Sequence, residues 1–391
     1  MNMIGMLYPR PLIRRLMRGG RSFEKPSLYV AAARELGEEM FFFSLADIDW
    51  RSGTARGWNG VDPVLRRRRI PDVILNRTRS VRAASRRAIA RLIRMGKRVS
   101  NERNVVSKLR IHRILASDPD LAAHLPETER LTPQAVAGLF PIAGSLYLKP
   151  RNASVGNGII RISQAEGGVI AEMNRLGRTV RRPICGMRLA GGEPSAGGAQ
   201  AASAARYGVA LRRASLDVGR RVASLVGSRR RRYLVQRGIN LMKYRGRPVD
   251  FRVSVQKGEE GRWQCTGIVG KAGRRQAVVT NLHCGGISIK ADTLFREWGW
   301  DAEKMKAEIS ALGLRAAQTI ERKLGGVSDI GFDIALDENG HPWLIEANFR
   351  DLRITFRNAG ERAVWVSTFA TPVKYAAYLR RTKGADGSWK S

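Results

Sequence analysis

One stretch near the C-terminal end constrains the fold of this chain more than any other, because it is typical of a β-hairpin. It reads DIGFDIALDENGHPWLIEANFR, residues 329–350. Asn339-Gly340 is a strong signal for a two-residue turn, since both positions tolerate positive φ. Pro342 then begins the return strand, a position at which the missing N–H is tolerated. We therefore expect two antiparallel strands that meet at Asn339-Gly340.

This turn would bring three oxygen-bearing side chains to one face of the hairpin. Glu338 pairs with His341, and Asp333 then falls opposite Glu346. Asn348 lies two residues beyond Glu346 and shares its face. Like charges directly opposite each other destabilise a sheet, whereas a bound divalent cation reverses that cost, and oxygen ligands suit Mg²⁺. The pattern predicts either a magnesium-binding hairpin or a surface hairpin with solvated acids.

The size and cysteine content of the chain narrow its class. Its 391 residues, 43% of them hydrophobic, allow two or three domains with a sizeable core. No apolar run reaches the roughly eighteen residues that a membrane span needs. Cys185, Cys265 and Cys284 are widely spaced, so neither a disulfide framework nor a zinc site is expected. A reducing cytoplasm fits best. The N-terminal stretch lacks the features of a leader peptide, and a first strand over Ile4–Tyr8 is expected there.

The net charge of +36 is extreme, and it has two interpretations. It arises from 70 basic residues against 34 acidic ones, with RRRR runs at 66–69 and 229–232. Such a charge attracts phosphate backbones, so non-specific polyanion binding at low salt is expected. The arginines are nevertheless spread over the whole length, and no RRM, KH or zinc-finger pattern accompanies them. Specific recognition of nucleic acid is therefore not favoured.

The first part of the chain, residues 1–104, is predicted to be a small α/β domain. Apolar strands alternate there with amphipathic helices, a pattern that favours parallel pairing. The strands expected are 4–8, 40–45 and 72–76, and the helices are 27–36 and 81–95.

Residues 105–380 are predicted to form a larger α+β unit divided near residue 235, followed by a disordered tail over 381–391. Helices are expected at 106–116, 207–226, 301–323 and 363–378, and strands at 145–149, 159–163, 233–236, 249–256 and 263–269. Residues 124–132 are expected to be a polar connection. The low-complexity stretch 190–205, AGGEPSAGGAQAASAA, is expected to be a mobile loop or a linker.

The loop LKPRNASVGNGII, residues 148–160, lies between two of these strands. Gly156 and Gly158 allow the backbone to approach a phosphate closely, and Lys149 can place a point charge on it. The order of residues differs from the phosphate loop GxxxxGK[ST], and a strand follows instead of a helix. The pattern alone predicts either a phosphate-binding loop or an ordinary hairpin turn.

Two further stretches carry polar residues that could serve a site. Gln236, at the end of the strand YLVQ, could bond an adenine edge or simply end its strand. In VVTNLHCGG, residues 278–286, Asn281 would project near the site. A thiol-nucleophile interpretation of Cys284 beside His283 is not favoured, because sequence neighbours rarely face each other and no orienting acid is evident.

Taken together, the order of these motifs resembles the ATP-grasp superfamily. A helix with Lys108, a lysine-glycine loop, LVQ, DFR, TNLHCGG and a D…E-x-N hairpin follow one another over about residues 104–360. The core is similar to that of RimK-type carboxylate–amine ligases, and the whole chain resembles the endospore coat-associated YheC/YheD family. The resemblance implies an ATP-grasp fold, preceded by an α/β pre-ATP-grasp domain.

The resemblance also implies roles for individual residues. Lys108 and Lys149 would contact ATP phosphates, with Ser154, Gly156 and Gly158 in a flexible phosphate lid. Adenine would be held by Gln236 and the backbone of Arg237 to Ile239. Asp333, Glu346 and Asn348 would bind Mg²⁺. Arg252 and Lys271 would stabilise an acyl phosphate, and Asn281 would lie near the phosphoryl-transfer centre.

The implied activity is ATP-dependent ligation of a small-molecule or peptide carboxylate to an amine. The alternatives are an ATP-binding structural protein of the spore coat without turnover and a basic polyanion-binding protein. The chain departs from the RimK-type pattern after Asn348, where it reads FRDLRITF instead of a Pro-Gly turn. Arg350 and Arg353 there either bind an anionic substrate or cover the surface. The sequence leaves open the substrates and the oligomeric state.

Overall fold

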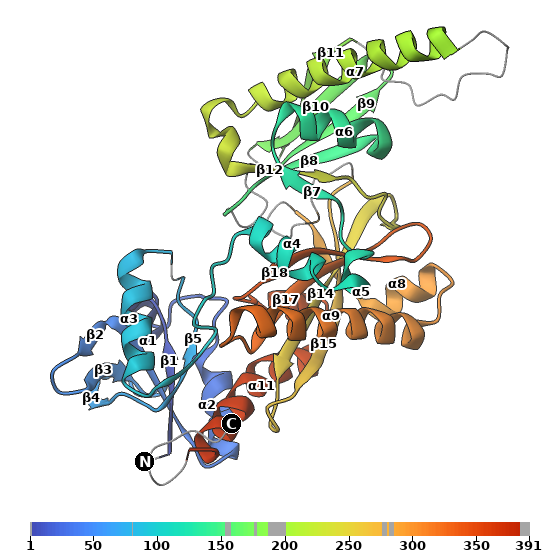
Figure 1. Cartoon of the computed structure of the whole chain (residues 1–391). Helices are drawn as coiled ribbons and strands as arrows, with labels where there is room; N and C mark the ends of the chain where they lie inside the picture. The colour runs from blue at the N-terminus through green and yellow to red at the C-terminus, as the bar shows by residue number, and fades with distance from the viewer. Residues whose placement is uncertain are drawn as a thin grey trace.

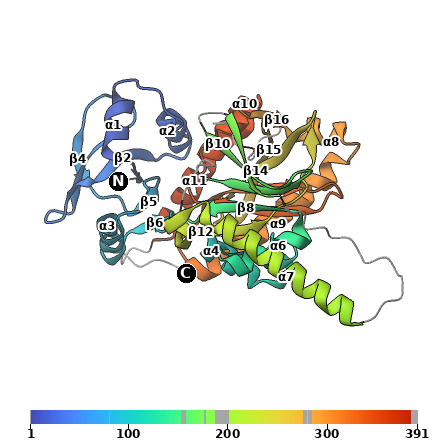
Figure 2. The same cartoon turned by 90° about the horizontal axis from the view of Figure 1, so that it is seen from above.

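The computed structural model describes residues 2–79, 81–152, 158–175, 178–186, 201–275, 280 and 285–383. These residues form three β-sheets. Figure 1 shows the first and second sheets at opposite ends of the molecule, with the third between them. Figure 2 shows, from above, that the first sheet is set to one side of the other two.

The N-terminal unit contains the first sheet, and its apolar strands pair in parallel as predicted. Its strand order is β4-β3-β2-β1-β5-β6, and β1 pairs in parallel with both β2 and β5. The strands are β1 Met3–Leu7, β2 Glu39–Asp49, β3 Thr54–Trp58, β4 Arg66–Arg69, β5 Val73–Asn76 and β6 Arg98–Ser100. The helices are α1 Arg10–Met17, α2 Pro26–Glu35 and α3 Ala83–Arg94.

Both faces of this first sheet are covered, as the buried apolar strands of a parallel sheet require. Side chains alternate along β1, so Ile4 and Met6 pack on the face covered by α2. Met3 and Leu7 pack on the opposite face, with Ile89 of α3.

The second sheet, with two helices on one face, makes the lobe at the top of Figure 1. Its order is β11-β10-β9-β8-β12-β7. The strands are β7 Thr128–Arg130, β8 Ser145–Pro150, β9 Ile160–Ala165, β10 Gly168–Arg175, β11 Arg178–Cys185 and β12 Tyr233–Arg237. The helices are α6 Pro133–Ala143, α7 Ala201–Ser224 and the 3-10 helix η1 Gly227–Arg232.

Two predictions for this lobe need correction. Residues 124–132 are not only a connection, because β7 lies within them and pairs with β12, so that Thr128 stands opposite Gln236. The expected loop 190–205 is wrong over residues 201–205, which begin α7. Residues 190–200 lie outside the described residues.

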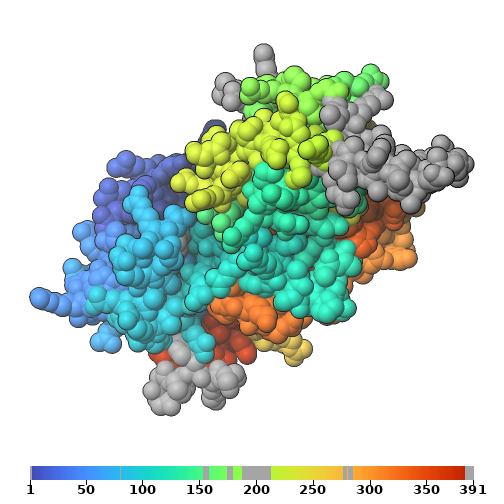
Figure 3. Space-filling model, turned by 45° about the horizontal axis from the view of Figure 1, so that its top comes forward, coloured from blue at the N-terminus to red at the C-terminus, as the bar shows by residue number. Residues whose placement is uncertain are grey.

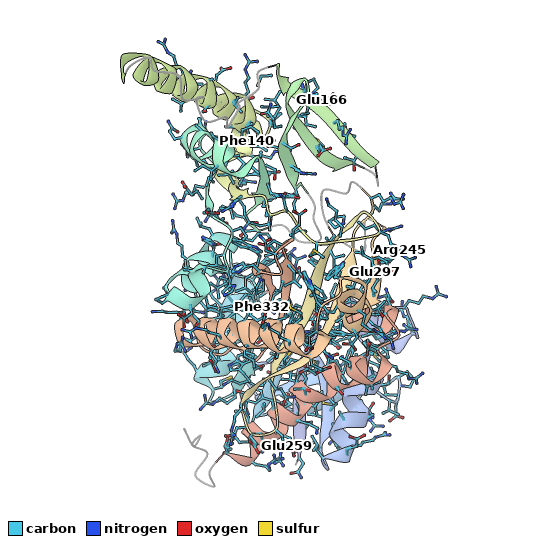
Figure 4. All side chains as sticks on the ribbon, turned by 90° about the vertical axis from the view of Figure 1, so that its right-hand side faces the viewer. Phe140, Glu166, Arg245, Glu259, Glu297 and Phe332 are labelled. Atoms are coloured by element: carbon cyan, nitrogen blue, oxygen red, sulfur yellow. The ribbon has the colours of Figure 1, made fainter. Side chains whose placement is uncertain are left out.

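The third sheet carries the hairpin and packs on a long helix. Its order is β16-β15-β14-β17-β18. The strands are β13 Lys243–Tyr244, β14 Arg247–Lys257, β15 Trp263–Ala272, β16 Ile287–Lys290, β17 Asp329–Leu336 and β18 Pro342–Asn348. The helices are α4 Lys108–Ala116, α5 Pro119–Ala122, α8 Ala291–Glu297, α9 Ala302–Leu324, α10 Ile354–Asn358 and α11 Arg362–Arg381. Figure 4 shows Phe332 of β17 inside this body and Phe140 of α6 inside the lobe above it.

The hairpin forms as predicted, but its turn differs. Asp337 pairs with His341, since its N–H donates to the His341 carbonyl at 3.1 Å. The loop therefore has three residues and ends at Gly340 with φ 81°. The Asp337 carboxylate explains this choice, because it accepts the backbone N–H groups of Asn339 and His341, each at 3.0 Å. The predicted Glu338–His341 pair is wrong.

Asp333 nevertheless lies opposite Glu346, as predicted. The three-residue loop shifts the pairing by one residue, so that Ile334 pairs with Leu344. A β-bulge then leaves Ile345 without a partner in the ladder and shifts the pairing back. The Asp333–Glu346 pair was predicted correctly because the third loop residue and the bulge, both missed from the sequence, shift the pairing by one residue in opposite directions.

The C-terminal helix α11 belongs to two units at once. Phe369, Val373 and Ala377 of α11 join the apolar core of the first sheet, next to Tyr29 of α2. The same helix packs against β14 and β15 of the third sheet. The tail predicted to begin at residue 381 is wrong at its start, since Arg381 ends α11, and residues 384–391 lie outside the described residues.

Candidate active site

A cleft of about 790 Å³ runs between the second sheet, the third sheet and the N-terminal unit. Figure 3 shows these parts around the segment from α4 to α6, drawn in teal. Ten of the predicted site residues line the cleft, namely Lys108, Lys149, Gln236, Arg237, Ile239, Arg252, Lys271, Asp333, Glu346 and Asn348. Ser154, Gly156 and Asn281 lie outside the described residues. The cleft therefore gathers residues from strands far apart in the sequence.

The predicted metal ligands lie together on the hairpin. Asp333 of β17 stands opposite Glu346 of β18, and the Asn348 amide lies 3.4 Å from Asp333 Oδ2. Three hard oxygen donors on neighbouring strands match the preference of Mg²⁺ for carboxylate and carbonyl oxygens. Lys108 of α4 donates to Glu346 Oε1, so one cation already faces this group. The donor set fits a magnesium ion, with Asp333, Glu346 and Asn348 as the residues that would hold it.

Lys271 joins two buried carboxylates beside this face. Its ammonium lies 3.0 Å from Asp250 Oδ1 and 2.8 Å from Asp333 Oδ1. Burial alone would raise the pKa of Asp333, but Arg252 and Lys271 outweigh it and hold that pKa below its usual value. Burial raises the pKa of Asp250, and neighbouring Asp333 adds to the rise. One lysine therefore balances two acids, and a cation bound to Asp333 would compete with it.

Arg252 is held between two carboxylates. Its Nη1 donates to Asp351 Oδ1 at 3.1 Å, and its Nε lies 3.1 Å from Asp333 Oδ1. Burial would lower the pKa of Arg252, but Asp333 and Asp351 raise it, so the guanidinium stays charged. Gly331 makes room for this arrangement, since a Cβ there would lie 2.8 Å from Arg252 Nη1 and from Asp351 Cγ.

Lys149 and Gln236 meet on neighbouring strands at the other wall of the cleft. Lys149 of β8 donates to Gln236 Oε1, and Gln236 Nε2 donates to Thr128 Oγ1 at 2.8 Å. The pKa of Lys149 falls to about 8, because burial disfavours the ammonium and the charge of Lys108 adds to that effect. Among the described residues, no carboxylate therefore pairs directly with Lys149.

Of the three residues predicted to form the phosphate lid, Ser154, Gly156 and Gly158, the structure describes Gly158. It has φ 76°, a conformation that favours glycine. A Cβ there would lie 3.1 Å from Pro150 Cγ and from the Tyr233 hydroxyl. The backbone geometry accounts for a glycine at this position, whatever the loop binds.

Sequence reasoning missed two acids of the site. Asp250 precedes Arg252 by two residues on β14, so period-two alternation could have placed both on one face. Asp351 gave no such signal, because it follows the hairpin in an irregular segment. Besides Arg252, its carboxylate accepts the hydroxyl of Ser254 and the backbone N–H of Arg353.

Of the two alternatives for Arg353, the surface role is wrong, because this side chain is buried although it lines the cleft. Its side chain is buried and donates to Asp329 Oδ2 and to the Tyr29 hydroxyl. The guanidinium lies 4.8 Å from the ring centroid of Phe369. Arg353 thus connects the third sheet to α2 and α11. Arg350 also lines the cleft.

Comparison with known proteins places this geometry in a family. A family model described as YheC/D like ATP-grasp matches residues 96–183 and 212–379. The endospore coat-associated protein YheD of Bacillus subtilis (strain 168) is 25% identical over 383 residues, which cover 92% of this chain and 75% of that protein. The endospore coat-associated protein YheC of the same organism is 22% identical over 148 residues, which cover 38% of this chain and 40% of that protein.

Solved structures give weaker likenesses. A RimK domain ATP-grasp protein from Sphaerobacter thermophilus DSM 20745 has a TM-score of 0.47 and 16% identity, covering 95% of this chain and 98% of that one. The D-cycloserine synthetase DcsG has a TM-score of 0.47 and 13% identity, covering 94% of this chain and 98% of that one. These values add nothing to the family match.

Proposed function

The chain belongs to the YheC/D-like ATP-grasp family, and on that premise we propose that it is an ATP- and Mg²⁺-dependent ligase that joins a carboxylate to an amine through an acyl phosphate. The observation that carries this proposal is the convergence of Asp333, Glu346 and Asn348 with Arg252 and Lys271 at one cleft. A purely structural chain has no need of three oxygen donors and two cations gathered at one cleft.

The nucleotide is expected to lie between the second and third sheets. Lys108 and Lys149 would contact its phosphates as point charges. Gln236 and the backbone of Arg237 to Ile239 would bond the adenine edge. Ser154, Gly156 and Gly158 would close over the phosphates. Mg²⁺ held by Asp333, Glu346 and Asn348 would neutralise phosphate charge during transfer.

In this reaction the protein mainly stabilises charge and forms no covalent bond to the substrates. A substrate carboxylate oxygen attacks the γ-phosphorus, the bond to the β–γ bridging oxygen breaks, and ADP leaves. The amine nitrogen attacks the acyl carbon and loses a proton, and orthophosphate leaves. Arg252 and Lys271 would face the charge that develops in both steps, with Asn281 near the transfer centre.

The partners of this reaction are proposed as a small-molecule or peptide acid and an amine. The names of the YheD and YheC relatives refer to the endospore coat, and an association of this chain with a spore coat is proposed on that ground alone. Within the described residues, no helix is both long and apolar enough to span a membrane.

The proposal is tested by thermal-shift titration with ATP, with and without Mg²⁺, on the wild type and on Glu346→Gln. Ligand binding raises the melting temperature by mass action, and a Mg²⁺-dependent rise that Glu346→Gln loses is expected. Acids and amines would then be screened for ADP release. An absence of any shift at millimolar ATP would contradict the proposal and favour a structural protein of the coat without turnover.

A further inference from the structure

The cleft does not end at the metal face but continues toward the N-terminal unit. Beyond Asn348, its walls include Phe23, Arg79, Val105 and Arg350. Arg79 follows β5 and Phe23 precedes α2, so both come from the region at the carboxyl ends of β1 and β5. Ligands of open α/β sheets bind at such ends, where neighbouring strands connect in opposite directions along the sheet. Here β1 leads to β2 on one side, and β5 leads to β6 on the other.

Arg350 is the central residue of this end of the cleft, and its guanidinium lacks adequate acceptors. Its Nη2 lies 3.4 Å from Glu24 Oε1, an oxygen that already accepts two shorter bonds from Arg77, at 2.9 and 3.2 Å. Its Nε is buried without a hydrogen-bond partner among the described residues. Burying an unsatisfied donor is costly, so this group is arranged for an acceptor that the described residues do not supply.

The charges that line the cleft also indicate an anionic ligand. They comprise nine cationic side chains and four carboxylates. All four carboxylates are already engaged by Lys108, Lys271 and Arg252. A nucleotide would face Lys149 and Lys108. None of the carboxylates lining the cleft is then left for Arg350, which shares Glu24, outside that lining, with Arg77. The Arg79 side chain forms no hydrogen bond or ion pair with any described residue.

The distance from the metal face to Arg350 limits the ligand. Arg350 follows Asn348 by two residues in a bend after β18, so their Cα atoms are at most roughly 7 Å apart. The walls between are partly apolar, with Phe23 44% exposed and Val105 37% exposed. A ligand that spans this distance needs an oxyanion at each end and a short apolar chain between them.

We propose that the end of the cleft around Arg350, with Arg79, binds a second oxyanion of the acid substrate, so that the substrate is an acid with two anionic groups a few carbons apart. The proposal rests on the proposed ligase function, because it assigns the other carboxylate to the phosphoryl-transfer centre. The guanidinium fork of Arg350 suits a carboxylate or a phosphate equally.

The test uses three probes of equal or similar length on the full chain in the presence of Mg-ADP. Glutarate carries two carboxylates, valerate carries one, and 4-phosphonobutyrate carries a carboxylate and a phosphonate. Affinities are taken from thermal-shift titrations at constant ionic strength. We expect the wild type to bind glutarate or 4-phosphonobutyrate about tenfold or more tightly than valerate, the gain of a charge-assisted hydrogen bond. Whichever of these two probes binds more tightly shows whether the second oxyanion is a carboxylate or a phosphate-like group.

Arg350→Gln should reduce that preference to less than about threefold. Arg357→Gln is the matched control, because Arg357 lies seven residues on, stacks over Trp365 at 5.5 Å and does not line the cleft. It should keep the full preference. An unchanged Mg-ADP response shows that each variant is folded. Arg350→Lys is a second variant in case Arg350→Gln does not fold. Because a lysine ammonium cannot make the two parallel hydrogen bonds of a guanidinium, this variant should bind glutarate several-fold more weakly than the wild type.

Equal affinity of the wild type for all three probes would overturn the proposal, as would a preference that Arg350→Gln and Arg350→Lys leave intact. Failure of the ligase proposal looks different. In that case Mg-ADP itself produces no shift with the wild type, while the preference for two oxyanions is measured without nucleotide.

Discussion

At the scale of single residues, the carboxylates of the site are each paired with a cationic side chain. Lys271 serves Asp250 and Asp333, and Arg252 serves Asp333 and Asp351. A bound anion or cation would compete with each of these ion pairs. Single substitutions therefore test individual roles.

Lys149 is expected to make nucleotide affinity depend on pH. Its pKa of about 8 means that the free protein loses this charge as pH rises through that value. Phosphate favours the ammonium, so ATP binding should take up a proton above pH about 8 and weaken by at most tenfold per pH unit. Calorimetry in buffers of different ionisation enthalpy measures the uptake. Lys149→Arg keeps the charge and should abolish both effects; if they persist, another group is responsible.

Asp351 is expected to position Arg252. In Asp351→Asn, the Nη1 end of Arg252 loses its charged acceptor, so the guanidinium is no longer fixed toward the transferred phosphoryl group. We expect the wild type to bind Mg-ADP with aluminium fluoride more tightly than Mg-ADP alone. This gain in affinity should fall about tenfold in Asp351→Asn. Arg252→Gln should lose it as well, and the double variant should lose no more than Arg252→Gln alone.

Asp329→Asn is the control for this experiment. Asp329 is a buried carboxylate that contacts Arg77, Arg353 and Gln256 but not Arg252. It should lower the melting temperature and leave the aluminium fluoride response intact. Equal loss of that response in both variants would mean that Asp351 acts only through general stability.

At the scale of elements, the hairpin shows what a sequence can and cannot reveal. Its two strands follow from apolar patterning and from Asn-Gly, and the face shared by Glu346 and Asn348 follows from period-two alternation. The loop length depends on the Asp337 carboxylate, and the bulge at Ile345 on packing. Neither local choice is encoded in hydrophobic periodicity. The partners of Asp351 and Arg353 were also unpredictable, because they come from segments distant in sequence.

Gly331 of β17 is expected to be required for the Arg252–Asp351 pair. A methyl group there would lie within 2.8 Å of the half-buried Arg252 and of the buried Asp351, and neither side chain can move away without losing their bond. Gly331→Ala should destabilise the protein by about 1–3 kcal/mol, measured by denaturant unfolding. Gly138→Ala in α6 meets nothing within 4 Å and should instead stabilise by about 0.5–1 kcal/mol. Unchanged stability of Gly331→Ala would show that the strand moves aside.

At the scale of the whole molecule, buried charges join the N-terminal unit to the third sheet. Arg77, which follows β5, donates to Glu24 and to the backbone carbonyl of Asp351. Arg353 reaches Asp329 and Tyr29, and α11 packs on both units. The first sheet is therefore connected to the segment that holds Arg252 through Asp351. The net charge of +36 gave no hint of this, since it does not distinguish buried from surface arginines.

The arginine runs show the same limitation. Residues 66–69 form β4, an edge strand, where charged side chains discourage pairing with another chain. Residues 229–232 fall in η1, just before β12. A polyanion surface stays a prediction, and retention on heparin at about 0.15 M salt would test it.

Arg353→Met is expected to show that this buried network determines the stability of the molecule. Methionine replaces the arginine by a side chain of similar length that cannot pair. Among the described residues, the Asp329 carboxylate then keeps its 3.4 Å contact with Arg77 and its bond from Gln256. Removing one partner of a buried ion pair costs about 3–5 kcal/mol, because the other charge stays buried. Adding Asp329→Asn removes that charge, so the double variant should be more stable than Arg353→Met alone. Denaturant unfolding followed by tryptophan fluorescence measures all three free energies of unfolding. Additive losses in the double variant would mean that Arg353 stabilises the junction by packing over Phe369 and not by its charge.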